Sequence, residues 1–294
     1  MDVNKIILAA AALLPAIVLC VYVFKKDRVE KEPIGLLLLL LVLGALTCYP
    51  AAEIERAMIS VLENLFVPYA VNIGGVNYLL GDTFKSFNAC KYFICVALVE
   101  EALKWIVLLL VTNNNKNLNS LFDGLIYAIF VSLGFAALEN VMYVFRLGLT
   151  NAALRAVTAV PGHMFDAVFM GYYYSMWHMY KKARKIEIEL EKRALITRNT
   201  TPLPTTKFLW LSLLVPVLFH GAYDYCCTVG TSLAWIVFYL LLIFLYIYCF
   251  GKIKKMSKQD CYANQFAGSI VIKKYPHLTS VVFEILGYTP EKES

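Results

Sequence analysis

Long apolar runs separated by short polar segments make up most of the chain. A transmembrane helix needs roughly 17–25 predominantly apolar residues, and seven runs meet or approach that length. They cover about residues 6–24, 34–50, 89–111, 122–147, 157–180, 208–228 and 233–250. The pattern predicts an all-α, polytopic integral membrane protein with a bundle of seven transmembrane helices. Residues 51–88 form the longest connection, where a re-entrant segment or an eighth crossing would fit.

The composition agrees with a membrane protein. Hydrophobic residues make up 60% of the 294 residues and charged residues 16%, whereas soluble domains have about 45–50% apolar and about 25% charged residues. We expect one transmembrane domain, residues 1–256, whose motif-bearing spans lie at about 89–228. A tail, residues 257–294, is expected at the inner surface of the membrane. No second large soluble domain fits into this length.

Basic residues cluster in the polar segments beside the apolar runs. Of the 27 Lys and Arg residues, 20 lie in four segments: 25–33, the turn around Lys116, 181–207 and 251–294. Cytoplasmic loops of membrane proteins carry an excess of Lys and Arg. All four segments fall on one side only if the chain crosses seven times, with its N-terminus outside and its C-terminus in the cytoplasm. The net charge of +6 therefore indicates a lipid bilayer, and no nucleic acid, as partner.

The third apolar run carries two adjacent carboxylates, Glu100 and Glu101, with Lys104 one turn further along. A charged side chain at the centre of a bilayer costs about 3 kcal/mol or more, so an ionisable residue inside a span marks a functional site by default. Other runs supply five more such residues: Glu139, His163, Asp166, His220 and Asp224. We therefore predict an active site built inside the membrane.

The predicted orientation places these groups at a similar depth. At 1.5 Å per residue, Glu100 and Glu101 lie about 17 Å from the outer end of their span. Glu139, His163 and His220 lie about six to eight residues from the outer ends of theirs. The polar groups of four spans should therefore converge in the outer half of the bilayer, which predicts one shared site reached from outside.

Spacing within the spans pairs some of these residues. Glu100 and Lys104 are four residues apart and meet on one helix face, while Glu101 points about 100° away. One carboxylate is thus expected to pair with Lys104 and the other to face a cavity. An acid beside a histidine fixes the tautomer of its ring or assists a metal ligand. Two pairs have that spacing: His163 with Asp166, and His220 with Asp224.

These groups suit the hydrolysis of an amide by water. A carboxylate such as Glu100 or Glu101 activates the water, and a metal ion or polar side chains stabilise the oxyanion. Two alternatives stay open. Glu139, His163 and His220 would form a three-ligand zinc (Zn2+) site with an open position for water. Without a metal, a glutamate base would act with histidines that orient the water and bind the oxyanion.

Four short strings and an Asp-Gly pair form an ordered series along the chain. They are Glu100-Glu101-Ala-Leu-Lys104, Asp123-Gly124, Phe135-Ala-Ala-Leu-Glu139-Asn140, His163-Met-Phe-Asp166 and His220-Gly-Ala-Tyr-Asp224. The series resembles the motifs of the PrsW family of intramembrane proteases, which is related to the CAAX prenyl endopeptidase/Abi superfamily. The catalytic set that the resemblance implies is Glu100, Glu101, Glu139, His163, His220 and Asp224. We expect supporting roles for Lys104, Asn140 and Asp166.

The resemblance also implies a function. The family is described as bacterial membrane proteases that cut anti-sigma factors outside the membrane, which starts regulated intramembrane proteolysis. We therefore expect an endopeptidase of the bacterial cell membrane whose substrate is a single-pass membrane protein, an anti-sigma factor, cut at site 1 near the outer face. The chain departs from the Abi pattern of EExxxR and HxxxN, because Lys104 comes one residue earlier and Asp224 replaces the Asn.

Two other functions are compatible with polar groups inside spans. A non-catalytic membrane scaffold or immunity protein would bind a partner without shortening it. A proton-coupled transporter would use the Glu, His and Asp residues as a relay. The sequence has no inverted repeat and no matching pair of Gly/Pro-broken helices, and this disfavours the transporter.

Overall fold

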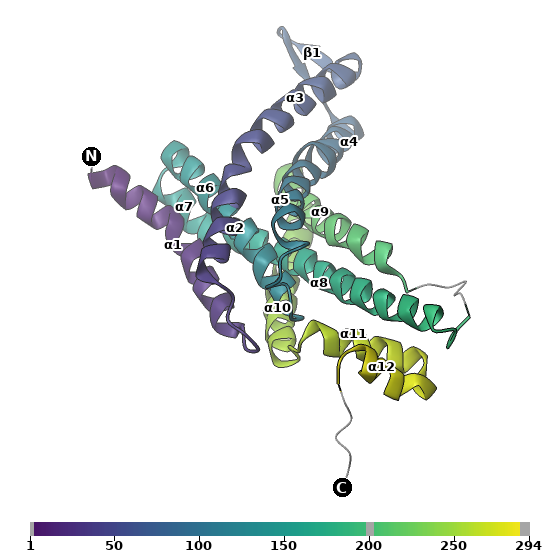
Figure 1. Cartoon of the computed structure of the whole chain (residues 1–294). Helices are drawn as coiled ribbons and strands as arrows, with labels where there is room; N and C mark the ends of the chain where they lie inside the picture. The colour runs from purple at the N-terminus through teal and green to yellow at the C-terminus, as the bar shows by residue number, and fades with distance from the viewer. Residues whose placement is uncertain (1–2, 198–202, 289–294) are drawn as a thin grey trace.

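The computed structural model describes residues 3–197 and 203–288, and in this part of the chain helices form nearly all of the regular structure (Figure 1). The first half contains α1 (Val3–Lys26), α2 (Ile34–Leu46), α3 (Cys48–Phe66), α4 (Gly81–Cys90), the π-helical turns η2 (Lys91–Ala97) and α5 (Leu98–Thr112). The second half contains α6 (Asp123–Leu147), α7 (Leu149–Val157), α8 (Ala159–Lys192), α9 (Thr205–Val229), α10 (Ser232–Lys258), α11 (Ala263–Lys274) and α12 (Thr279–Ile285).

Five helical segments in the described residues are long and apolar enough to cross a membrane. They are Lys5–Lys26, Ile34–Tyr69, Asp123–Leu147, Thr205–Val229 and Ser232–Lys258. The prediction of an all-α, polytopic membrane protein is therefore confirmed. The other two predicted spans correspond to η2 with α5 and to α8, which carry more polar residues, and the count of seven crossings stays a prediction.

The segment after the second apolar run differs from the connection expected there. The helix continues from α2 through α3 to the 3-10 turn Val67–Tyr69, as one segment of 36 residues. A short antiparallel hairpin follows, in which β1 (Val71–Ile73) pairs with β2 (Val76–Tyr78). Gly74 and Gly75 make its turn with φ of +60° and +85°, a conformation that favours glycine. Polar α3 residues thus extend a membrane helix rather than open a loop.

Helix α6 is the centre of the bundle, where α1, α2 and α8 pack around it (Figure 1). Every side chain from Asp123 to Ala136 is buried. Two glycines let α2 and α6 approach closely: a Cβ on Gly44 would lie 1.9 Å from the Val131 carbonyl oxygen, and one on Gly134 would lie 2.0 Å from that of Leu41. Small residues at such crossings allow backbone contact between membrane helices.

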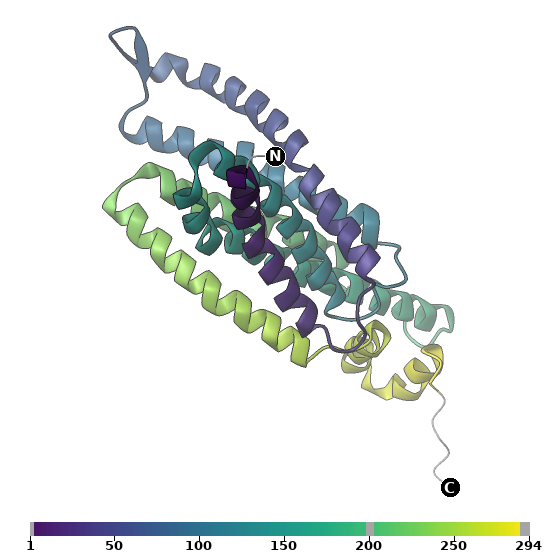
Figure 2. The same ribbon diagram turned by 90° about the vertical axis from the view of Figure 1, so that its left-hand side faces the viewer.

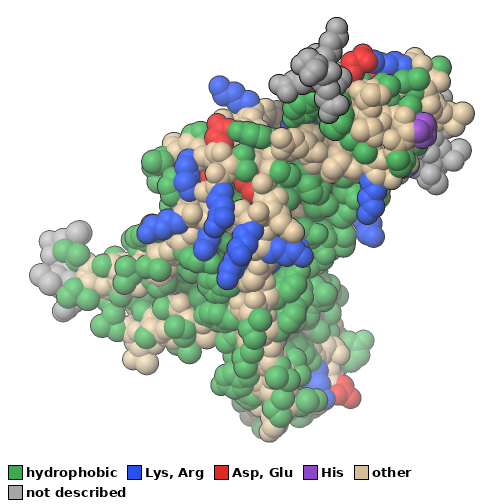
Figure 3. All heavy atoms as spheres, turned by 90° about the horizontal axis from the view of Figure 1, so that it is seen from below, with side chains coloured by type: hydrophobic (Ala, Val, Ile, Leu, Met, Phe, Trp, Pro, Cys, Tyr) green, Lys and Arg blue, Asp and Glu red, His purple; other side chains and the backbone are tan. Residues whose placement is uncertain are grey.

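The two ends of the bundle differ in character. The β1–β2 hairpin, the α6–α7 turn and the α9–α10 turn lie at one end, which we call the hairpin end, and α11 and α12 lie at the other, the C-terminal end (Figure 2). At the C-terminal end Ser257 Oγ donates to the Lys26 carbonyl, and the Ala263 N–H donates to the Asn119 carbonyl at 2.7 Å. Figure 3 views this end, where Lys and Arg side chains gather.

The tail is folded onto the rest of the chain. Helices α11 and α12 pack against the extension of α8 beyond the bundle, through a separate apolar core that includes Ala183, Leu190, Val271 and Val282. The described parts of the four basic segments therefore lie at one end of the molecule (Figure 3). This arrangement agrees with the positive-inside pattern.

Glu32, in the connection between α1 and α2, provides a stability prediction. Its side chain is 4% exposed and accepts a hydrogen bond from Tyr127. Burial raises the pKa of Glu32 from 4.5 to about 9. The folded chain thus binds a proton that the unfolded chain has lost, so stability falls as the pH rises from about 4.5 to about 9.

We expect Glu32→Gln to stabilise the fold at pH 8, by about 1 kcal/mol or more, because glutamine keeps the shape without the charge. Thermal unfolding of the purified protein in detergent at pH 5 and pH 8 measures the effect, which should be larger at pH 8. Glu30→Gln is the control, since Glu30 lies in the same connection and is exposed. Equal shifts in both variants would contradict the assignment.

Candidate active site

Four helices carry the ionisable residues predicted for the site, and their packing brings these residues together. Helix α5 contributes Glu100, Glu101 and Lys104, and α6 contributes Glu139. Helix α8 contributes His163 and Asp166, and α9 contributes His220 and Asp224. Helices α5 and α8 both pack against α6 and α9, so residues far apart in the sequence share one buried space.

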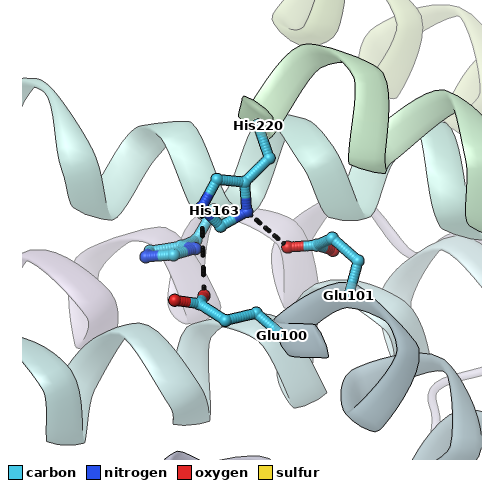
Figure 4. Close-up of side chains that lie close together, drawn as sticks. All are labelled: Glu100, Glu101, His163 and His220. Carbon is cyan, nitrogen blue, oxygen red and sulfur yellow. Dashed lines mark hydrogen bonds and ion pairs between the residues drawn. The ribbon is translucent and has the colours of Figure 1, made fainter. Parts of the chain in front are cut away.

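Two carboxylates and two imidazoles form the centre of this site (Figure 4). Glu100, Glu101, His163 and His220 each offer one nitrogen or oxygen atom, and these four atoms lie within 4.8 Å of one another. All four side chains are buried, and the centroids of the two imidazole rings are 5.4 Å apart. The group shares its histidines with the zinc site predicted from the sequence, and has Glu100 and Glu101 where that prediction has Glu139.

Lys104 lies fully buried beside this group and contacts three of its members. Its Nζ is 2.8 Å from Glu101 Oε1, 3.2 Å from Glu100 Oε2 and 3.2 Å from His163 Nδ1. The expectation that Glu101 points away from Lys104 is therefore wrong. Positions three and four residues apart are both neighbours on a helix, and the lysine side chain is long enough to reach both carboxylates.

The same contacts fix the tautomer of His163. A lysine ammonium has no lone pair, so it donates to Nδ1, and the proton of the neutral ring is then on Nε2. Nε2 lies 2.9 Å from Glu139 Oε2 and donates to it. Glu139 thus orients the His163 ring through Nε2, the nitrogen opposite the one that faces Lys104. Carboxylates orient metal-binding histidines in the same way. The hydroxyl of Ser132 also donates to the His163 carbonyl at 2.8 Å, which ties α6 to α8.

Arg155 of α7 is a site residue that the sequence reasoning missed. Its guanidinium donates to Glu139 Oε2 at 2.5 Å and to Asn140 Oδ1 at 3.0 Å, and it lies over the ring of Tyr143. Asn140 in turn donates to the Ala12 carbonyl of α1 at 2.8 Å. The position of Arg155 just before the fifth apolar run gave no sign that α7 would fold back over the site.

His220 lies among four acids. Its Nδ1 is 2.9 Å from Glu101 Oε1 and 3.8 Å from Asp166 Oδ2. Its Nε2 is 3.5 Å from Asp224 Oδ2 and 3.9 Å from Glu100 Oε2. The expected pairing of Asp166 with His163 does not form: Asp166 lies beside His220 on the neighbouring helix. His163 instead turns its two ring nitrogens toward Lys104 and Glu139, and the close packing of α8 and α9 supplies the partner of Asp166.

Two cavities adjoin the site. One, of about 520 Å³, reaches toward the hairpin end at Lys91 and Thr228. It is lined by Glu100, Glu139, His163, Asp166, His220 and Asp224. The other, of about 280 Å³, lies between α3 and α6, and Glu100 and Glu139 are part of its wall. Glu55 of α3 lines both cavities. The sequence reasoning missed Glu55 as a site residue because it placed it in a connection.

The four central residues fit a divalent metal. Imidazole nitrogens and carboxylate oxygens are ligands that zinc takes, and Glu101 Oε2 is buried without a hydrogen-bond partner among the described residues. A metal ion held by this group would compete with the Lys104 ammonium, which contacts Glu100, Glu101 and His163. The donors also suit proton transfer, because Glu100 and both histidines line the larger cavity.

Comparison with known proteins agrees with this chemistry. The family model for PrsW family intramembrane metalloproteases matches residues 32–250. Protease PrsW of Bacillus subtilis is 30% identical over 249 residues, which cover 85% of this chain and 94% of the relative. Protease PrsW of Clostridioides difficile is 28% identical over 280 residues, which cover 92% and 99%.

A third relative, Protease PrsW of Geobacillus kaustophilus, is 28% identical over 218 residues, covering 74% of this chain and 78% of the relative. No solved structure matches the chain significantly. The matched region contains α5, α6, α8 and α9 and thus the whole buried cluster. The resemblance seen in the motifs is confirmed: the chain belongs to the PrsW family of intramembrane metalloproteases, and it is a protease that acts on membrane proteins within the bilayer.

Proposed function

We propose that the chain hydrolyses a peptide bond near the outer end of a single-pass membrane protein, and that the substrate is an anti-sigma factor. The observation that carries the proposal is the buried group of Glu100, Glu101, His163 and His220 beside a cavity that reaches the hairpin end. The hairpin end faces outward if the basic C-terminal end lies in the cytoplasm. The protein then resides in the bacterial cell membrane with its N-terminus outside.

The two adjacent carboxylates differ in their access to the cavities, and this difference supports different roles for them. Glu100 lines both cavities, whereas Glu101 lines neither and is fully buried. Water or a substrate that enters the cavity therefore meets Glu100. We assign Glu100 as the general base and Glu101 as a residue that holds His220 and Lys104. In the reaction Glu100 takes a proton from water, the water oxygen bonds to the scissile carbonyl carbon, and the proton passes to the departing amine nitrogen as the C–N bond breaks.

His163, His220 and Glu101 would hold the metal, with Glu139 and Asp224 orienting the histidines from behind. A zinc ion bound there supplies Lewis acidity, which polarises a carbonyl and lowers the pKa of water. Arg155 keeps Glu139 in its place behind His163. Asp166, beside His220, adds a further carboxyl group next to the histidine.

Cleavage of defined reporters tests the function. The purified wild type is reconstituted in liposomes with single-pass reporters that carry a tag at each end and a varied segment at the outer end of the span. We expect two fragments, with the cut located by mass spectrometry near that outer end. Reporters that bind yet stay intact would favour the scaffold instead, and proton flux in the sealed liposomes would favour the transporter.

A further inference from the structure

Among the described residues, Glu55 of α3 is the carboxylate of the two active-site cavities that lies outside the predicted set, and its surroundings differ from those of the others. Glu55 borders three cavities: the two that adjoin the active site and a third, of about 390 Å³, which is lined by α3 residues between Ala52 and Glu63. Glu55 thus stands at the place where these spaces meet. A chain segment that lay along α3 and reached Glu100 would pass Glu55.

The other acids of the cavity wall have partners. Glu139 pairs with Arg155 and His163, Glu100 pairs with Lys104, and Asp166 and Asp224 lie beside His220. Within the described residues Glu55 makes no hydrogen bond or ion pair, although it is close enough to Glu100 and Glu139 for their charges to act on it. Its partly buried carboxylate therefore faces the cavity with its hydrogen-bonding capacity unused.

Helix α3 is also a weakly embedded wall of the site. Of its residues, Cys48 and Ala51 are buried, while Ile54, Val61 and Leu65 are exposed. In the views of Figures 1 and 2, α3 extends away from the bundle toward the hairpin end. The cavity between α3 and α6 is lined by the apolar residues Ala52, Phe135 and Met142 together with Glu100. A peptide segment in this cavity would therefore contact both α3 and the general base.

We propose that Glu55 sets the substrate specificity of the site by binding a Lys or Arg side chain next to the scissile bond. The inference rests on the proposed function, because it presumes that a peptide segment lies between α3 and the buried group. An unpaired carboxylate that is shielded from bulk water forms a strong charge-assisted hydrogen bond with a cationic side chain. A neutral or acidic side chain at the same place would leave Glu55 unpaired or repelled.

A competing explanation is that Glu55 only neutralises nearby basic side chains. Lys91 lines the larger cavity and Arg146 the smaller one, and Glu55 lines both. If Glu55 only balanced these two charges, its replacement would change the cleavage rates of all substrates by the same factor. If Glu55 binds the substrate, its replacement changes the ratio of the cleavage rates of different substrates. The ratio is therefore the quantity to measure.

The test uses reporters with one span that differ at a single position of the outer segment, which holds Lys, Gln or Glu and is moved along the segment. We expect the wild type to cut the best Lys reporter about ten times faster than its Gln counterpart, the factor that corresponds to about 1.4 kcal/mol. In Glu55→Gln the ratio should fall to near one, and Glu55→Lys should prefer the Glu reporter. Glu53→Gln should keep the wild-type ratio, since Glu53 lies on the same helix, is exposed and pairs with Arg56.

Three outcomes would overturn the assignment: no Lys preference in the wild type, an unchanged ratio in Glu55→Gln, or an equal loss with all reporters. Thermal unfolding of each variant in detergent identifies one that does not fold, and Glu55→Lys with the Glu reporter then decides, because a gain cannot come from misfolding. If the wild type cuts no reporter at all, the proposed function itself fails. If it cuts every reporter alike, only the role of Glu55 fails.

Discussion

Glu100→Gln should lower the rate of reporter cleavage by about 10²–10⁴-fold, the usual contribution of a general base. Glutamine keeps the size of the side chain, but its amide does not accept the proton of water as a carboxylate does. Glu100 is the member of the adjacent pair that lines both cavities. The rate of fragment formation in liposomes, measured beside bound metal for each variant, gives the result.

Replacement of the adjacent residue, Glu101, distinguishes the general base from a metal ligand. Glu101→Gln should also lose cleavage, but through a different defect, because Glu101 Oε1 contacts both Lys104 and His220. We expect Glu100→Gln to retain bound metal and Glu101→Gln to lose most of it. Full activity in Glu100→Gln would exclude it as the base, and metal loss in Glu100→Gln alone would reverse the two roles. Glu53→Gln, on exposed α3 surface, serves as the control that should stay active.

His163→Ala and His220→Ala should each remove the metal. We expect about one zinc ion per wild-type chain by mass spectrometry of the purified protein, and less than about a tenth of that in either variant, because three ligands are the minimum that catalytic zinc sites use. A chelator such as 1,10-phenanthroline should stop cleavage, and added zinc should restore it. His277→Ala is the matched control, since His277 is exposed in the tail.

The absence of bound metal would point to a different mechanism. A wild type without bound metal, whose cleavage resists the chelator, would make the protein a glutamate protease. In that case Lys104, which contacts Glu100, Glu101 and His163, would supply the positive charge that holds the group together. Zinc retained in both histidine variants would contradict the ligand set rather than the presence of a metal.

The sequence by itself determined the fold class, the family and the helices that carry the site. Apolar runs long enough to cross a bilayer predict helices, because a helix makes all of its backbone hydrogen bonds within one segment and lipid offers no other partners. Charges inside such runs are costly, so Glu100, Glu101, His163 and His220 were visible as candidates without any structure. The order of the motifs then gave the family, which the comparisons confirm.

Only the tertiary structure decided how these side chains meet. Rotation and tilt of membrane helices are set by packing against their neighbours, which a hydropathy pattern does not contain. Packing turned Asp166 toward His220, folded Arg155 of α7 onto Glu139, and left Glu55 facing the cavities. The difference between Glu100 at the cavity wall and Glu101 in the interior has the same origin: adjacent residues on a helix point about 100° apart, and the surrounding helices decide which direction is open.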